Sequence, residues 1–284
     1  MRIDLHVHSS VSDGTDSPTR LVVAAREAGL DVIALCDHDT FDGLVEATTA
    51  GQQIGVEVLA GVELSTRYQG KSVHLLGYGC DPRHPELSTE MKRLRASRAG
   101  RLEKYLQRLA ELGMPLTADE VMTQVGLSPS LGRPHIADAM VAKGYVKDRD
   151  EAFGLYLSES GPAYVRRYAT DLREAIAMVR RAKGVPVVAH PWGRGNRDRL
   201  SEDVIESLAA DGLDGIEVDH TDHDARDRER LARLSERTGL IHTGGSDYHG
   251  TGKPNNPLGI NTTSLSAYRE ILRRIAERGG VLPS

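Results

Sequence analysis

Residues 2–14 read RIDLHVHSSVSDG, and this stretch decides how the rest of the chain is interpreted. Apolar and polar side chains alternate over 2–8, which predicts a β-strand. Residues i and i+2 of a strand share a face, so His6 and His8 can reach the same metal ion. Asp13 follows five residues after His8. A strand that ends in two imidazoles and a nearby carboxylate predicts a metal site at its C-terminal end.

Further strands are expected along the chain, separated by helical patterns. This alternation is typical of βαβ units and of a largely parallel sheet. Seven such strands favour a closed barrel over a short open sheet. The expected strands lie at about 2–8, 32–37, 57–64, 73–79, 185–190, 214–219 and 240–246.

The alternation stops between about 82 and 166. That stretch contains a long charged helical pattern near 86–112 and shorter helical patterns after it, without a convincing strand. We therefore predict a helical insertion sub-domain over 85–164, which could serve as a lid. Residues 1–84 and 165–284 would form the barrel.

Metal-ligating residue types recur at or beside these strand ends. The C-terminal ends of parallel strands form a common ligand crevice, so residues far apart in sequence can converge there. A single histidine at a strand end usually has an ordinary structural role. A whole cluster without a metal would carry heavy costs of desolvation and charge repulsion. The candidate ligands are His6, His8, Asp13, His38, Glu63, His74, His190, Asp247 and His249.

These six imidazoles and three carboxylates exceed the need of one ion. A zinc-like site takes only three or four protein ligands, so we expect two ions and most naturally three. Imidazole and carboxylate ligands without thiolate suit Mn²⁺, Fe²⁺ or Zn²⁺, of which we favour Mn²⁺. Cys36 and Cys80 are expected to lie in the core.

Composition narrows the class of protein. The 284 residues include 36 basic and 41 acidic side chains, a net charge of −5, with 39% hydrophobic residues. These values are typical of a globular protein with a core, and they disfavour a sequence-independent duplex-DNA binder. No apolar run approaches the ~18 residues that cross a bilayer, and the N-terminus lacks a signal-peptide pattern. We expect a cytoplasmic protein without membrane attachment or an obligate protein partner.

Five motifs resemble one family in order and spacing. They are DLHVHSSVSDG at 4–14, DHDT at 37–40, GVELS at 61–65, AHP at 189–191 and SDYH at 246–249. This series resembles the polymerase and histidinol phosphatase (PHP) family, over about 1–80 and 165–255. The resemblance implies an α/β fold, a distorted (β/α)7 TIM-like barrel, with a two- or three-metal phosphoesterase site.

The resemblance also implies how the ligands are shared among the ions. One ion would be held by His6, His8, Glu63 and Asp247, a second by Glu63, His74 and His190, and a third by Asp13, His38 and His249.

The GRPHIA stretch at 132–137 is similar to that of stand-alone bacterial enzymes of the family. Those enzymes remove the 3′-phosphate from nucleoside 3′,5′-bisphosphates, and their relatives trim short oligonucleotides from the 5′ end. The resemblance therefore implies a phosphomonoesterase acting on a small nucleotide such as adenosine 3′,5′-bisphosphate. Two alternatives stay open: a 5′-to-3′ exonuclease on short oligonucleotides, and a histidinol-phosphate phosphatase.

For this chemistry we expect a metal-bridging hydroxide as the nucleophile, so no side chain is assigned as catalytic. A metal-bound water or a protonated imidazole, such as that of His220 or His223, could supply the leaving-group proton. Phosphate recognition should come from arginine, whose planar fork matches two phosphate oxygens. The expected substrate-binding residues are Arg133 and His135 in the insertion, Arg194 and Arg197 in the loop after His190, and His223.

Other classes fit less well. Amide or lactone hydrolases on metal barrels also begin with an H-x-H motif, but they usually have a bridging lysine where Glu63 stands here. A metal-stabilised scaffold without activity is disfavoured by the full donor set. The basic helical pattern near 90–108 could guide an anionic substrate or be an ordinary solvated face.

Overall fold

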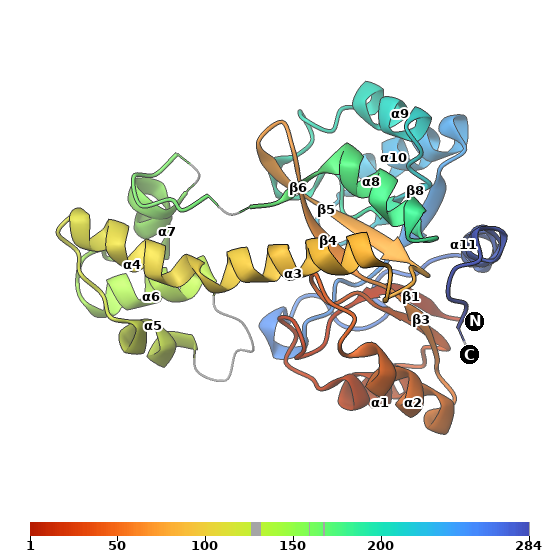
Figure 1. The fold of residues 1–284 in the computed structure, drawn as a ribbon, viewed down its shortest axis with the longest axis horizontal. Helices are drawn as coiled ribbons and strands as arrows, with labels where there is room; N and C mark the ends of the chain where they lie inside the picture. Colours follow the sequence, from red (N-terminus) through yellow and green to blue (C-terminus); the bar gives the residue numbers. More distant parts are fainter. Residues whose placement is uncertain (126–131, 159, 167, 284) are drawn as a thin grey trace. The chain divides into compact units, whose positions relative to one another are not determined.

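The computed structural model describes residues 1–125, 132–158, 160–166 and 168–283, apart from the side chains at 98, 99 and 194. The chain divides into two compact units (Figure 1). The first consists of Met1–Lys92 and Ala169–Ser284, and the second of Arg93–Tyr168. The long helix α3 (Pro85–Ala99) begins in the first unit and ends in the second. That the helical segment acts as a lid stays a prediction.

The first unit contains two sheets, a three-stranded parallel one and a six-stranded mixed one. The smaller sheet has the order β1 (Ile3–Val7), β2 (Val32–Leu35) and β3 (Glu57–Ala60). The larger sheet has the order β6 (Thr170–Asp171), β4 (Glu63–Tyr68), β5 (Lys71–Tyr78), β7 (Val185–Val188), β8 (Gly215–Asp219) and β9 (Ile241–Gly244). The mixed α/β class is confirmed, whereas a closed seven-stranded barrel is not.

The expected strand at 57–64 is in fact the whole of β3 followed by the start of β4. Gly61 lies at the break, where a Cβ would come within 2.8 Å of the Leu35 carbonyl oxygen. β4 then turns back on itself through Gln69 and Gly70, both with positive φ, into antiparallel β5. Two such residues are what a tight hairpin turn requires. This hairpin, together with the antiparallel pairing of β5 with β7, makes the larger sheet mixed.

Two single-residue bridges connect the sheets. Val7 pairs with Tyr248 beyond β9, and His38 beyond β2 pairs with Glu63 at the start of β4. The C-terminal ends of β1, β2 and β9 therefore meet the first residue of β4. This is the place where the candidate ligands gather.

Helices pack on the outside of these strands (Figure 1). Ser17 begins α1 as the sequence predicts, because its side chain accepts a hydrogen bond from the Arg20 amide. Cys36 and Cys80 are buried. Among the described helices, none is long and apolar enough to cross a membrane. The helices are α1 (Pro18–Glu27), α2 (Leu44–Ile54), α8 (Leu172–Arg181), α9 (Glu202–Ala210), α10 (Ala225–Thr238) and α11 (Leu265–Arg278).

The second unit has its own core, in which Tyr105, Leu109 and Met140 are buried. Three arginines of its first helices hydrogen-bond Tyr164, Val165 and Tyr168. Arg93 reaches the Tyr168 hydroxyl at 3.0 Å, Arg101 the Val165 carbonyl at 3.1 Å, and Arg108 the Tyr164 carbonyl. These contacts give part of the basic helix a structural role. The remaining elements are α4 (Arg101–Glu111), α5 (Ala118–Val125), α6 (Arg133–Ala142), α7 (Arg149–Ala152) and a π-helical turn (Phe153–Leu157).

Asp214 is a buried carboxylate on which three arginines converge, and we expect Asp214→Ala to destabilise the first unit. The carboxylate is 4% exposed and pairs with Arg278 at 2.5 Å, Arg274 at 2.8 Å and Arg180 at 3.3 Å. Its loss should cost about 3 kcal/mol, the lower end for a broken buried pair, because the arginines can regain water. Urea unfolding measures this cost. Asp211→Ala, which breaks an exposed pair with Arg173, should cost less than about 1 kcal/mol, and equal costs would contradict the prediction.

Candidate metal centre

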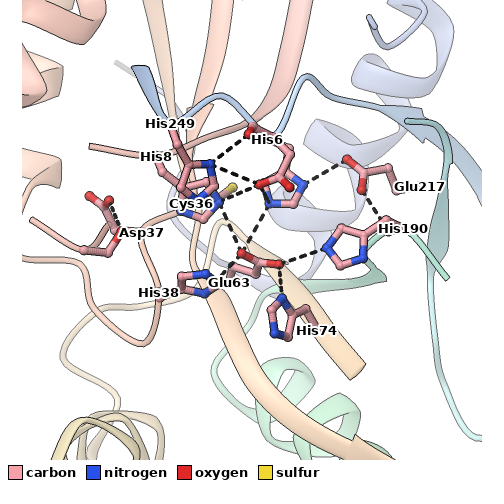
Figure 2. Close-up of polar contacts among 12 residues, drawn as sticks. His6, His8, Cys36, Asp37, His38, Glu63, His74, His190, Glu217 and His249 are labelled. Atoms are coloured by element: carbon pink, nitrogen blue, oxygen red, sulfur yellow. Dashed lines mark hydrogen bonds and ion pairs between the residues drawn. The ribbon is translucent and has the colours of Figure 1, made fainter. Parts of the chain in front are cut away.

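All nine predicted ligands lie in one cluster at the strand ends (Figure 2 draws most of them). β1 contributes His6, His8 follows directly after β1, and β4 contributes Glu63 as its first residue. The others follow β2, β7 and β9, lie within β5, or belong to the loop after β1. Asp13, in that loop, has a 25% exposed side chain, whereas the other eight are buried.

Glu63 occupies the centre of the cluster. Both of its oxygens face imidazole nitrogens, and its side chain is 1% exposed. Burial by itself would raise the pKa of this carboxyl, but the neighbouring His38 and His74 outweigh that effect and hold the pKa well below its usual range. The distances from Glu63 are 3.4 Å to His6 Nε2, 3.2 Å to His8 Nε2, 3.1 Å to His38 Nδ1, 2.6 Å to His74 Nδ1 and 3.4 Å to His190 Nε2.

Three groups of ligand atoms are close enough to share an ion, each within 4.8 Å. The first agrees with the grouping that the family resemblance implies. The second contains His38 in place of His190, and the third contains His8 as an additional member. The groups are His6, His8, Glu63 and Asp247; His38, Glu63 and His74; and His8, Asp13, His38 and His249.

The donors fit divalent cations. His6 Nε2 and both ring nitrogens of His8 are buried without a hydrogen-bond partner among the described residues. Proteins rarely leave buried polar atoms unsatisfied, and a metal ion would satisfy these nitrogens. The mixed imidazole and carboxylate set suits Mn²⁺, Fe²⁺ or Zn²⁺.

Hydrogen bonds to groups other than the candidate ligand atoms fix the orientation of two rings. His249 Nδ1 donates to the Asp247 carbonyl at 2.8 Å, which leaves Nε2 facing Asp13 at 3.1 Å. His6 Nδ1 donates to Glu217 at 3.0 Å, which leaves Nε2 facing Glu63. Such partners determine which nitrogen of a histidine is available to a metal.

Glu217 and Lys253 contact the cluster although the sequence motifs do not predict them. Glu217 is a buried acid between Ile216 and Val218 in β8, and a carboxylate inside an otherwise apolar strand was the available signal. Lys253 Nζ contacts Asp247 at 2.6 Å. Nothing in its local sequence marks this lysine, because the loop that carries it has no regular pattern.

The two histidines expected as proton donors differ in their surroundings. His223 Nδ1 donates to the Val218 carbonyl at 2.9 Å, and its Nε2 accepts from the Trp192 amide at 3.2 Å. Both nitrogens are therefore engaged within the protein, and substrate binding or proton donation by His223 stays a prediction. His220 Nδ1 accepts from the Asp222 amide at 3.0 Å, so the neutral ring carries its proton on Nε2, 3.5 Å from Asp247. Of these two rings, that of His220 directs its N–H toward the cluster, and its role as a proton donor stays a prediction.

In the loop after His190, the side chain of Arg197 contacts other residues of the protein. Arg197 pairs with Asp227 at 2.8 Å and lies 5.1 Å from the Trp192 ring centre. The side chain of Arg194 lies outside the described part of the structure. Phosphate binding by this loop stays a prediction.

The candidates in the helical segment belong to the second unit and have local partners there. Arg133 donates to the Leu157 carbonyl at 3.2 Å and lies 5.6 Å from the rings of Phe153 and Tyr164. His135 Nδ1 accepts from the Gly132 amide at 3.0 Å and so helps to begin α6. Their role in phosphate recognition also stays a prediction.

Comparisons with known proteins agree with this arrangement. A family model for the PHP domain matches residues 4–91. A 3′,5′-nucleoside bisphosphate phosphatase of Chromobacterium violaceum is 34% identical over 97% of this chain and 97% of its own length. The chain belongs to the PHP family. This membership confirms the resemblance seen in the sequence motifs.

Two further matches show how far the likeness extends. A 5′-3′ exoribonuclease of Haemophilus influenzae is 33% identical over 87% of this chain and 90% of its own length. A solved structure described as a metal-dependent phosphoesterase, from Bifidobacterium adolescentis, superposes with a TM-score of 0.82. It is 40% identical and the match covers 96% of both chains, the helical segment included.

We expect the ion-free PHP protein to lose stability as the pH rises from 6.5 to 9.5. Burial alone would lower the pKa of His8, but the carboxylates of Asp247 and Glu63, 3.4 and 3.2 Å from its Nε2, outweigh burial and raise the pKa to about 9. A raised pKa contributes stability that is complete below 6.5 and lost as the pH passes about 9. The loss should be on the order of a few kcal/mol in urea unfolding. With Mn²⁺ bound the trend should reverse, since ions compete with protons for the imidazoles; a flat profile in the ion-free protein would contradict the prediction.

Proposed function

We propose that this PHP protein removes the 3′-phosphate from nucleoside 3′,5′-bisphosphates, giving a 5′-nucleotide and phosphate. The family places the chain among the hydrolases that act on phosphoric ester bonds. One observation carries the proposal most directly. A buried carboxylate, Glu63, is surrounded by five imidazoles, and two of them, His6 and His8, have ring nitrogens without a hydrogen-bond partner among the described residues. Such a cluster suits several divalent cations and is of little use for structure alone.

The chain's residues would hold up to three ions, with Mn²⁺ favoured. Divalent ions bound there supply Lewis-acid chemistry, by activating water and neutralising phosphoryl oxygens. Glu63 would be shared between two ions, since it belongs to two of the three groups. His190 lies 3.4 Å from Glu63 and would complete the second set. We also propose that the two sheets, joined at Val7–Tyr248 and His38–Glu63, together form the family's distorted barrel.

Substrate recognition would come from cationic side chains. Arginine binds phosphate through two parallel hydrogen bonds, which suits a nucleotide with two phosphates. We propose this role for Arg133 with His135, and for Arg194 and Arg197. Similarity to the bisphosphate phosphatase over 97% of the chain, helical segment included, supports a small nucleotide as substrate.

A 5′-to-3′ exonuclease is the second candidate. A terminal phosphodiester resembles a bisphosphate with a larger leaving group, so the same ions could serve both reactions. The 33% identity to the Haemophilus exoribonuclease favours this alternative. Histidinol phosphate lacks a specific observation in its favour.

Phosphate release in the presence of Mn²⁺ decides between these reactions. The substrates are adenosine 3′,5′-bisphosphate, AMP, histidinol phosphate and a short 5′-phosphorylated RNA. We expect fast release from the bisphosphate with 5′-AMP as the product, and little release from AMP. Mononucleotides from the RNA together with a slow bisphosphate reaction would establish the exonuclease instead. Fast hydrolysis of histidinol phosphate alone would overturn both.

A further inference from the structure

Glu217 links two of the candidate ligands without belonging to any of the three ligand groups (Figure 2). It lies in β8 with 1% of its surface exposed. Its Oε1 accepts a hydrogen bond from His6 Nδ1 at 3.0 Å, and its Oε2 accepts one from the His190 backbone amide at 2.8 Å. Each oxygen of one carboxylate therefore serves a different residue.

The contact with His6 fixes which ring nitrogen faces the cluster. Because Nδ1 gives its hydrogen to Glu217, Nε2 is directed toward Glu63 and Asp247, at 3.4 and 3.7 Å. A carboxylate behind a histidine also makes the other nitrogen a better metal ligand. Glu217 thus determines both the direction and the basicity of His6.

The contact with His190 anchors an unusual backbone conformation. His190 has a φ of +29°, and residues other than glycine rarely adopt a positive φ. Such strain persists only where surrounding contacts hold it. The Glu217 oxygen holds the amide of this residue, and the ring then lies 3.4 Å from Glu63.

The residues around His6 and Glu217 are packed too closely for either side chain to move freely. A Cβ at Gly245 would lie 2.3 Å from the His6 Cβ and 2.9 Å from Glu217 Oε1. The neighbouring strand end therefore approaches the pair as closely as glycine allows, and this leaves the Glu217 carboxylate little freedom to move.

We infer that Glu217 is a positioning residue that holds His6 and His190, and thereby builds the two ion sites that share Glu63. The inference rests on the proposed metal centre. It assigns no such role to Glu217 at the group formed by Asp13, His38 and His249, which Glu217 does not contact in the described structure. The two Glu63-sharing sites should therefore depend on Glu217, and the third should not.

The test is Glu217→Gln, with Mn²⁺ bound per chain measured against free Mn²⁺ by equilibrium dialysis. An amide has one acceptor oxygen, so at most one of the two contacts survives. We expect at least one of the two Glu63-sharing sites to bind about 10–100-fold more weakly, with one site unchanged.

Glu57→Gln is the control. Glu57 accepts a hydrogen bond from the Tyr268 hydroxyl and contacts none of the nine candidate ligands among the described residues. It should leave every Mn²⁺ affinity as in the wild type. Circular dichroism of both variants establishes that they are folded.

The outcomes separate the inference from the function on which it rests. Wild-type protein that binds no Mn²⁺ overturns the metal centre itself. Wild-type binding with unchanged affinities in Glu217→Gln, or an equal loss at all three sites, overturns the role of Glu217 alone. A further test uses the wild-type protein: an NMR spectrum of the protein loaded with Zn²⁺ shows which ring nitrogen of His6 carries a proton. A proton on His6 Nδ1 supports the inference, and a metal-bound Nδ1 overturns it.

Discussion

We expect Glu63→Gln to abolish phosphoesterase activity and to lower kcat/KM by about 10³-fold or more. Removing one group that stabilises transition-state charge already costs about 10²–10³-fold. Glu63 does more than that, because it belongs to two of the three ligand groups and neutralises the imidazoles around it. The neutral amide keeps the shape of the side chain and loses the charge that the ions require. Steady-state hydrolysis with saturating Mn²⁺ measures the effect.

A matched control separates this loss from a general effect of removing a carboxylate. Glu57 lies on the preceding strand, β3, and contacts the hydroxyl of Tyr268, away from the cluster. Glu57→Gln should retain activity near that of the wild type. If Glu63→Gln kept more than a tenth of the activity with its ions bound, Glu63 would not be the shared ligand and the proposed centre would be wrong.

The sequence predicts well those parts of the metal centre that follow from local rules of strand geometry. Alternation along a strand places His6 and His8 on one face, and both side chains do face Glu63. The rule that strand ends share a crevice predicts that His190 and Asp247 meet them, which they do despite their separation in sequence. Such rules need only the period of the strand and the direction of the chain.

The features that the sequence does not predict depend on packing between residues far apart in the chain. The β4–β5 hairpin interrupts the parallel pattern through Gln69-Gly70, which is not among the strongest turn signals. His223 resembles any other histidine near a strand end, yet contacts with Val218 and Trp192 engage both of its nitrogens. Only the folded chain brings Glu217 behind His6, since 211 positions separate them.

Loading with Mn²⁺ is expected to raise the melting temperature of the ion-free protein by about 10 °C or more. A ligand at 100 times its dissociation constant adds about 2.7 kcal/mol to the stability of the folded state. Two ions then add about 5 kcal/mol, and each kcal/mol shifts the melting temperature by about 2–4 °C in a chain of this size. The ions also relieve the crowding of ionisable groups around Glu63, where buried imidazoles otherwise depend on a few carboxylates. Differential scanning calorimetry before and after Mn²⁺ addition measures the shift.

Two variants distinguish the contributions of the ligand groups. Asp13 belongs to one group only and is the most exposed of the nine residues, so Asp13→Asn should keep most of the shift. Glu63→Gln should lose most of it, because two groups are broken at once. Equal shifts in both variants would mean that Mn²⁺ stabilises the protein from elsewhere on its surface. An unchanged melting temperature in the wild type would mean that the buried imidazoles serve the fold alone, and the hydrolytic function would then need another centre.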